Sequence, residues 1–441
     1  MSNKPKSVYI KTYGCQMNVY DSKRILEILN NIGYNEVPAV NKADLIVLNT
    51  CHIRDKAAEK VYSDLGRFAS KKKTTPDTKI ILAGCVAQAE GEEIFKRQPL
   101  VDLVIGPQTY HRLPELLSKI KKNKDKAIDT SFPTESKFDY LLEERKDKGP
   151  VSFISIQEGC DKFCTFCVVP YTRGAEYSRP VEKIINESKK LIEKGARELV
   201  LLGQNVNAYH GQDSKNRSCS LADLLFLLSK IDGVERLRYT TSHPSDVTED
   251  LIAAHKDIEV LMPYLHLPVQ SGSDKVLKLM NRNYSFESYS EIIKLLRKAR
   301  PDIAISSDFI VGFPGETDID FYKTIELVKK INFSQSYSFK YSIRPGTPAS
   351  LMDGQVEVSV KNNRLKVLQK VLDDQQMNFN NDFVGLDVDV LFDRIGKKKN
   401  QIIGRTPWMQ AVHVDGSEEL LGLIRSVKII AAGPKSLAGK I

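Results

Sequence analysis

The chain has 441 residues, of which 41% are hydrophobic and 27% are charged. This length exceeds the size at which one hydrophobic core usually splits, so we expect two or three domains. No apolar run approaches the roughly 18 residues of a membrane span, and the first residues lack the apolar core of a secretion signal, so we expect no membrane association and a cytoplasmic location. The net charge of +9 suits a polyanionic partner, although solvated lysines explain it equally well.

The amino-terminal part repeats a strand followed by a helix three times. Strand patterns at residues 7–13, 43–50 and 79–84 are each followed by a cysteine. The helices are expected at residues 21–32, with Asp21 as the N-cap, at 54–69 and at 85–95. Because the carboxyl ends of parallel strands share one edge of a sheet, the three thiols should converge into a metal site with one open position. These thiols are Cys15, Cys51 and Cys85; three unrelated buried thiols are the alternative.

Residues 121–145 have mixed charge and are expected to be a linker. A longer series of strands and helices follows it and predicts a parallel sheet curled into an incomplete barrel. Its six strands are expected at residues 151–157, 198–203, 236–242, 264–268, 303–311 and 333–341.

Three further cysteines, Cys160, Cys164 and Cys167, follow the first strand of this series with C-x3-C-x2-C spacing. Thiolates so closely spaced can hold three corners of an iron–sulfur cube and leave one iron open to a small molecule. Buried structural cysteines are one alternative. Zinc is another, but it prefers four ligands, and the nearest histidines, His111 and His210, are more than forty residues away in sequence.

Polar residues end several of the later strands and are expected to line a pocket at the carboxyl face of the barrel. Among them are Gln204, Asn205, Ser242 and Asp308. The tail predicts a helix at residues 361–379 and then short strands, which fit a small β-barrel. In that barrel, Lys397, Lys398, Arg405 and Trp408 offer phosphate contacts and base stacking; a purely structural β-appendage is the alternative.

The cysteine spacing and the neighbouring motifs resemble those of the radical S-adenosylmethionine methylthiotransferases over nearly the whole chain. The motifs that carry the resemblance are Gly14-Cys15-Gln16-Met17-Asn18, Asn49-Thr50-Cys51, Ala83-Gly84-Cys85 and the run from Glu158 to Gly174. The seventh cysteine, Cys219, matches no motif of the family. The resemblance implies an α/β chain with a parallel amino-terminal domain at 6–120, an incomplete (βα)6 radical core at 146–378 and an RNA-binding β-barrel of the TRAM type at 379–441.

The motifs around Cys15 and Cys51 are most similar to those of the tRNA branch of this family. That branch methylthiolates C2 of N6-isopentenyladenosine next to the anticodon, with two [4Fe-4S] clusters and two S-adenosylmethionine molecules. The resemblance implies that Cys160, Cys164 and Cys167 hold the radical-generating cluster and that Cys15, Cys51 and Cys85 hold the sulfur-delivering one. His52, beside a predicted ligand, could tune that cluster by hydrogen bonding or simply pack.

The family also implies the partners of the chain. They are the tRNA anticodon stem-loop, a one-electron reductant such as flavodoxin or ferredoxin, and a sulfur donor or cluster-assembly proteins. S-adenosylmethionine would occupy the pocket at Gln204, Asn205, Ser242 and Asp308. The alternatives are a methylthiotransferase for threonylcarbamoyladenosine in tRNA or for a ribosomal protein, and a non-catalytic iron–sulfur electron carrier or RNA-binding protein.

Overall fold

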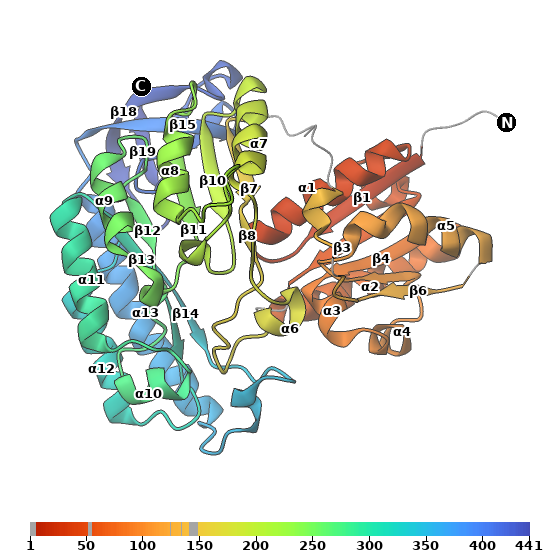
Figure 1. Cartoon of the computed structure of the whole chain (residues 1–441), viewed down its shortest axis with the longest axis horizontal. Helices are drawn as coiled ribbons and strands as arrows, with labels where there is room; N and C mark the ends of the chain where they lie inside the picture. The colour runs from red at the N-terminus through yellow and green to blue at the C-terminus, as the bar shows by residue number, and fades with distance from the viewer. Residues whose placement is uncertain (1–5, 52–54, 124, 134, 141–148) are drawn as a thin grey trace. The chain divides into compact units, whose positions relative to one another are not determined.

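The computed structural model describes residues 6–51, 55–123, 125–133, 135–140 and 149–441 (Figure 1). The chain forms two compact units. The first contains Met1–Lys146, Glu158–Asp161 and Val168–Glu176, and the second contains Asp147–Gln157, Lys162–Cys167 and Tyr177–Ile441. Within the described residues, no helix is both long enough and apolar enough to cross a membrane.

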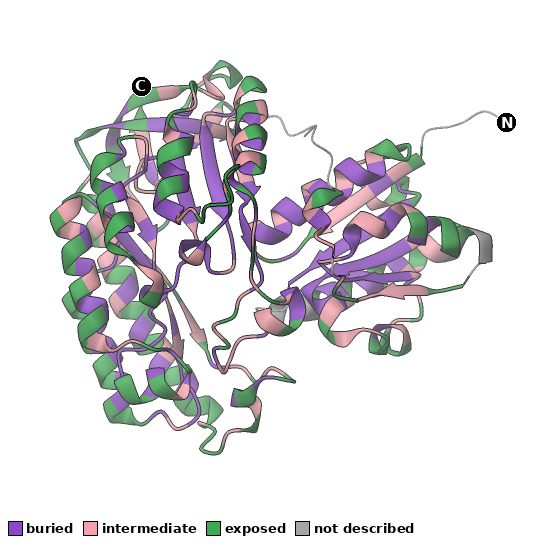
Figure 2. Cartoon of the chain, viewed as in Figure 1, coloured by how far each residue is buried: buried purple, intermediate pink, exposed green. Residues whose placement is uncertain are grey.

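The first unit is built on a six-stranded sheet whose paired strands are all parallel. In spatial order the strands are β2 Tyr34–Glu36, β1 Lys6–Thr12, β3 Leu45–Thr50, β4 Lys79–Gly84, β5 Leu103–Ile105 and β6 Ala127–Asp129. All six residues of β3 are buried, as Figure 2 shows for the centre of the sheet. Continuous burial is typical of a parallel strand that is covered on both faces. The strand patterns did not predict β2, β5 and β6, of which β6 lies in the segment expected to be a linker.

Helices cover both faces of this sheet. The helices are α1 Gln16–Asn31, α2 Asp55–Thr74, α3 Cys85–Glu90, α4 Glu93–Arg97, α5 Leu113–Asn123 and α6 Val169–Arg173. Apolar side chains of α1 and α5 join one core, and those of α2 and α4 join the other.

Two of the predicted helices differ from the structure. The prediction of Asp21 as an N-cap is wrong, since α1 begins at Gln16 after an N-cap at Cys15, and Asp21 is a buried residue of its second turn. The single helix expected at 85–95 is interrupted between α3 and α4, where Gly91 has a φ of 52°. A positive φ is outside the helical region and ends the first piece.

The second unit contains the incomplete barrel. Its six parallel strands form two three-stranded sheets, β7 Val151–Ser155 with β10 Glu198–Leu202 and β11 Arg236–Thr240, and β12 Tyr264–His266 with β13 Ala304–Val311 and β14 Gln335–Lys340. An isolated parallel bridge joins Leu237 of β11 to Leu261, three residues before β12. The sequence therefore predicted the six strands and their parallel direction correctly.

Helices pack around these strands in the order expected of a βα series. They are α7 Val181–Glu193, α8 Leu221–Ser229, α9 Glu249–Asp257, α10 Asp274–Leu279, α11 Phe286–Ala299, α12 Asp318–Ile331 and α13 Val358–Asn381. The short strands β8 Gln157–Glu158 and β9 Tyr177–Ser178 come before and after the second cysteine motif in sequence.

A closed five-stranded barrel follows α13 in the same unit. Its strands are β15 Asp387–Ile395, β16 Gln401–Arg405, β17 Ala411–Asp415, β18 Ile424–Ala432 and β19 Leu437–Lys440. Alternate residues fill its core, among them Val390, Phe392 and Val427. Buried Arg236 and Arg238 of β11 donate hydrogen bonds to its main-chain carbonyls at 2.7 to 3.0 Å. The predicted small β-barrel is present, and the strand β11 supports it directly.

Candidate functional site

The first cysteine set lies where three parallel strands of the first unit end together. Thr12 of β1 is paired with Asn49 of β3, and Thr50 of β3 is paired with Gly84 of β4. Cys51 and Cys85 are the next residues after β3 and β4, and Cys15 follows β1 by three residues. The register therefore places all three cysteines at the carboxyl edge of the sheet, as the sequence predicted.

Side chains next to Cys15 and Cys51 hold the two cysteine loops together by hydrogen bonds. Asn18 donates from its amide to the carbonyl of Thr50 at 3.0 Å, and Asn49 donates to the carbonyl of Asn18 at 2.8 Å. A Cβ atom on Gly14, which has a φ of +115°, would lie 2.2 Å from Cβ of Cys51. Only glycine fits such a close approach, so the motif residues beside Cys15 and Cys51 pack the two loops together.

The three thiols share one electrostatic environment. A hydrogen bond with Cys51 lowers the pKa of Cys15 to about 6, and the guanidinium of Arg173 acts in the same direction. Burial raises the pKa of Cys85, and Arg173 opposes this shift. The thiolate is the form that binds metal, so Arg173 favours the ligand form of both thiols.

Arg173 belongs to a buried network of four charged side chains in the first unit. It contacts Asp21 and Glu158, each at 2.6 Å, and Lys137 contacts Glu158 at 2.6 Å and Asp21 at 3.8 Å. None of the four is more than 4% exposed. Two cations and two carboxylates make the network neutral, which reduces the cost of burying each charge. Sequence patterns did not identify this network, because Arg173 and Asp21 are 152 positions apart.

The second cysteine motif lies in a loop without helix or strand. Cys160 belongs to the first unit, where its amide donates to the carbonyl of Gly174 at 3.3 Å. Cys164 and Cys167 belong to the second unit, and the amide of Cys167 donates to the carbonyl of Cys164 at 2.9 Å. The three cysteines lie within eight consecutive residues of the sequence.

The turn after α10 holds the second part of this loop. The amide of Thr165 donates to the carbonyl of Met280 at 3.1 Å, and Asn281 donates from its side chain to the carbonyls of Lys162 and Phe163 at 3.2 and 3.1 Å. Arg282, the next residue, donates to Sγ of Cys164 at 3.6 Å. Sequence patterns did not identify Asn281 and Arg282, although a polar run between two helices is a usable signal.

Some of the predicted pocket residues have buried polar atoms that find no hydrogen-bond partner in the described part of the chain. Oδ1 of Asn205 and Oγ of Ser242 are in this group, as is Nε2 of the neighbouring His243. The side-chain amide nitrogen of Asn205 donates to Asp246 at 2.8 Å. Asp246 also accepts a hydrogen bond from Lys162 of the cysteine loop at 2.7 Å. Unpaired buried atoms at the ends of β10 and β11 are suited to bind a polar ligand.

The other two predicted pocket residues have protein contacts. The main-chain amide of Gln204 donates to Oε1 of Gln157 at 2.8 Å. Asp308 of β13 lies 3.5 Å from Nε2 of His266, the last residue of β12. Both residues are half-buried, so their side chains are partly accessible.

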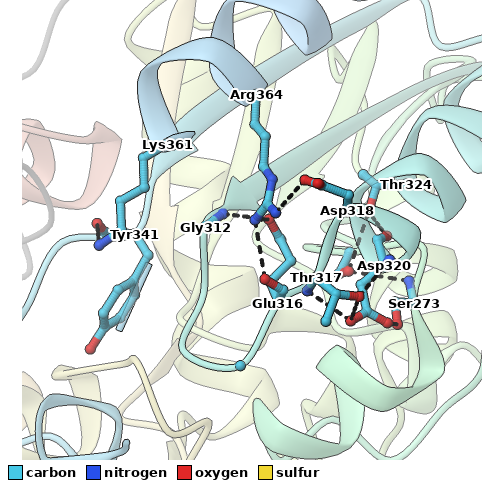
Figure 3. Close-up of polar contacts among 12 residues, drawn as sticks. Ser273, Gly312, Glu316, Thr317, Asp318, Asp320, Thr324, Tyr341, Lys361 and Arg364 are labelled. Atoms are coloured by element: carbon cyan, nitrogen blue, oxygen red, sulfur yellow. Dashed lines mark hydrogen bonds and ion pairs between the residues drawn. The ribbon is translucent and has the colours of Figure 1, made fainter. Parts of the chain in front are cut away.

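One strand-end motif of this unit is engaged in internal contacts. Glu316 accepts hydrogen bonds from the amide of Gly312 and from Arg364, both at 2.8 Å, and Arg364 also contacts Asp318 (Figure 3). Lys361 packs over the ring of Tyr341, with 5.2 Å between Nζ and the ring centroid. These contacts fasten α13 across the ends of β13 and β14 and leave Glu316 little freedom for catalysis.

The predicted RNA-binding residues fall into two groups. Trp408 donates from its indole nitrogen to the carbonyl of Asp302 at 2.8 Å and packs on Phe383, and Arg405 donates to the carbonyl of Met409 at 2.9 Å. Lys397 and Lys398 are exposed in the turn between β15 and β16. The two lysines are therefore accessible to phosphate, whereas Trp408 and Arg405 are held by contacts inside their own unit. His52 lies outside the described residues.

The chemistry of the two donor sets fits iron–sulfur clusters, because cysteine thiolates are the usual ligands of such clusters. Each set has three cysteines, so each could hold three corners of a four-iron cube and leave one iron open. Among the residues that the structure describes, no three His, Cys, Asp or Glu side chains are grouped as the ligands of a single metal ion.

The chain is similar to known proteins over nearly its full length. Residues 7–106 match the uncharacterized protein family UPF0004, and residues 154–328 match the Radical SAM superfamily. The chain is 56% identical over 438 residues to the tRNA-2-methylthio-N(6)-dimethylallyladenosine synthase of Ruegeria sp. (strain TM1040), with 99% of each chain covered. It is 56% identical over 442 residues to the synthase of the same name from Rickettsia bellii (strain RML369-C), again with 99% of each covered.

Solved structures support the fold alone, because their sequences are distant. The radical S-adenosylmethionine methyltransferase TsrM from Kitasatospora setae, with cobalamin and a [4Fe-4S] cluster bound, is 13% identical, with a TM-score of 0.59 over 79% of this chain and 77% of its own. The cobalamin-dependent enzyme OxsB matches with a TM-score of 0.51 at 13% identity over 83% of this chain and 56% of its own. By full-length sequence identity and by both of its domain matches, the chain belongs to the family of tRNA-2-methylthio-N(6)-dimethylallyladenosine synthases within the radical S-adenosylmethionine superfamily.

Proposed function

We propose that this chain methylthiolates C2 of N6-isopentenyladenosine next to the anticodon in tRNA. The observation that carries the proposal is the pair of three-cysteine sets in a chain that is 56% identical over its full length to synthases of this name. An aromatic C–H bond has no acidic proton that an ordinary side chain could remove, so cofactors must supply the difficult step. Bound at the two sets, [4Fe-4S] clusters supply reductive cleavage of S-adenosylmethionine to a hydrogen-abstracting radical and a source of sulfur, and a second S-adenosylmethionine supplies the methyl group.

The residues of the chain bind and orient these groups. Cys160, Cys164 and Cys167 would hold one cluster, in a loop that Asn281 and Thr165 fix to the core. The unpaired oxygens of Asn205 and Ser242 would accept hydrogen bonds from S-adenosylmethionine, with Gln204 and Asp308 at the same face of the barrel.

Cys15, Cys51 and Cys85 would hold the second cluster, in a site that Asn18 and Asn49 lock. Arg173 favours the thiolate form of these ligands, as its effect on the pKa values of Cys15 and Cys85 indicates.

The tRNA would contact both the catalytic face and the carboxy-terminal barrel. Lys397 and Lys398 are exposed, as phosphate contacts require, and an unstacked loop base can enter a pocket. We propose the domain boundaries 6–120, 121–145, 146–378 and 379–441, with the last domain as the RNA-binding one. We also propose a cytoplasmic location, a flavodoxin or ferredoxin as reductant and a cluster-assembly protein as sulfur donor.

The proposal is tested with the reconstituted protein and tRNA that lacks only the methylthio group. Nucleoside mass spectrometry should show the 2-methylthio derivative of N6-isopentenyladenosine. Parallel reactions with threonylcarbamoyladenosine-containing tRNA and with ribosomal proteins should show no methylthio product. Intact clusters that give no cleavage of S-adenosylmethionine would favour a non-catalytic iron–sulfur protein instead.

A further inference from the structure

Arg282 stands out in the second unit as a buried cation that contacts a cysteine of the radical motif. Arg282 is only 7% exposed. One guanidinium nitrogen donates to Sγ of Cys164 at 3.6 Å, and another donates to the carbonyl of Pro268 at 2.7 Å. Its Nε donates to the hydroxyl of Tyr284, whose ring lies 5.1 Å from the guanidinium carbon. The guanidinium is therefore fixed from three directions.

No carboxylate pairs with Arg282 in the part of the chain that the structure describes. Of the other buried arginines of this unit, Arg179, Arg238 and Arg364 pair with Glu187, Glu198 and Glu316 at 2.8 to 3.0 Å. Arg236 donates to two main-chain carbonyl oxygens and, unlike Arg282, contacts no sulfur among the described residues. A buried charge normally requires an opposite charge nearby. Arg282 therefore has no carboxylate partner among the described residues. It donates instead to the sulfur of Cys164, which is a predicted ligand of an anionic cluster.

The anion that fits is the cluster itself. A four-iron cluster with a doubly positive core and three thiolates carries one net negative charge, and its one-electron reduced form carries two. A fixed cation in a low-dielectric site stabilises the more negative form more strongly. Hydrogen bonds to ligand sulfur and local net charge are established means of tuning cluster potentials.

We propose that the positive charge of Arg282 balances the negative charge of the radical-generating cluster. It thereby raises the reduction potential of that cluster. The inference rests on the proposed function only in assigning a cluster to Cys160, Cys164 and Cys167. In the step concerned, an external donor such as dithionite loses one electron and the cluster gains it, and no bond is formed or broken. Arg282 does not touch the substrate; it acts through Cys164.

The experiment is a redox titration of the full-length reconstituted protein, followed by electron paramagnetic resonance. The signal that changes when S-adenosylmethionine is added identifies the radical-generating cluster. Arg282→Gln should lower its midpoint potential by about 59 mV, which is a tenfold loss in the equilibrium constant for one-electron reduction. Arg282→Lys, which keeps the charge, should restore most of the shift. Arg217→Gln removes the same charge from an exposed side chain and should leave the potential unchanged, because solvent screens it.

Each outcome decides the proposal. An unchanged potential in Arg282→Gln with wild-type iron content would overturn it. If Arg282→Gln loses the cluster, then retention in Arg282→Lys supports the charge role, and loss in both variants shows a packing role and overturns it. Failure of the proposed function would look different, because the wild-type protein would then show no methylthio product while the potential shift between variants could still be measured.

Discussion

The two cysteine sets differ in how the protein balances the charge beside them. At the first set, Arg173 approaches the thiols from a neutral network with Asp21, Glu158 and Lys137. At the second, Arg282 approaches Cys164 with no carboxylate partner among the described residues. The first network is neutral before any cofactor binds, whereas under our proposal the charge of Arg282 would be balanced by the cluster. The first surroundings would then keep their charge balance with or without a cofactor, and the second would favour uptake of an electron.

The largest expected effect comes from removing a ligand of the second set. Cys164→Ala should lower the rate of reductive cleavage of S-adenosylmethionine by more than about 100-fold. Loss of a residue that only hydrogen-bonds to a metal ligand costs up to about 100-fold, and loss of the ligand itself should cost more. Iron content should fall from about eight to about four per chain, because only one cluster is lost. High-performance liquid chromatography of 5′-deoxyadenosine and an iron assay measure both. Cys219→Ala, outside both sets, is the matched control, and wild-type cleavage by Cys164→Ala would contradict the assignment.

Arginine truncation in the cluster-free protein tests the charge balance directly. Arg173→Met leaves two buried carboxylates with one cation and should lower the free energy of unfolding by about 3–5 kcal/mol. Arg282→Met removes a cation without a carboxylate partner and should cost less. Urea unfolding measures both variants. The control Arg67→Met removes an exposed side chain from Asp64, which keeps Lys11 and Tyr13 as partners, so it should change stability by less than about 1 kcal/mol. Equal losses at Arg173 and Arg282 would remove the distinction between the sites.

Glycines before the first cysteine of each set allow a finer comparison. A Cβ at Gly14 would lie 2.2 Å from Cys51, and one at Gly159, before Cys160, would lie 1.9 Å from the carbonyl oxygen of Ala175. Gly14→Ala should therefore displace a ligand and reduce iron loading, and Gly159→Ala should distort the other loop. Gly33→Ala has the same kind of positive φ with no atom within 4 Å, so it should cost only the backbone strain of about 1–2 kcal/mol. Iron assays and thermal unfolding separate the three, and full loading of Gly14→Ala would disprove the close approach.

The smallest expected effect is a pH dependence confined to the second unit. Burial lowers the pKa of His255 to about 3, and its Nε2 lies 2.7 Å from the hydroxyl of Tyr239. The unfolded state, with a pKa of about 6.5, binds the proton first, so the stability from neutral His255 is present above that pH and is lost as pH falls toward 3. Between about pH 7.5 and pH 5.5, the wild type should lose about 1.4 kcal/mol more than His255→Gln. Equal losses in urea titrations would show that His255 is not buried neutral.

The sequence predicted the parts of this molecule that depend on local pattern. The strands before Cys15, Cys51 and Cys85 are apolar runs with a cysteine at the same place in each repeat, so their shared sheet edge followed from the topology alone. The three-residue strands β2, β5 and β6 escaped prediction because they are too short to show a period.

The partners of the charged and aromatic residues could not be predicted. Asp21 looked like a helix cap because its acidic side chain precedes an apolar pattern, but its partner Arg173 is 152 positions away. Trp408 looked free to stack on a base, but its indole donates to Asp302, 106 positions away. Such pairings are set by tertiary structure, and periodicity within a segment carries no information about them.

Cys15→Ala tests most directly whether one cysteine set generates the radical and the other delivers the sulfur. The reconstituted variant is given dithionite, S-adenosylmethionine and tRNA that lacks only the methylthio group, and both 5′-deoxyadenosine and modified nucleosides are measured by mass spectrometry. We predict that it still cleaves S-adenosylmethionine but forms no methylthiolated base, because the second set is intact and the sulfur-delivering site is not. Full methylthiolation by Cys15→Ala would contradict the assignment of two distinct sites.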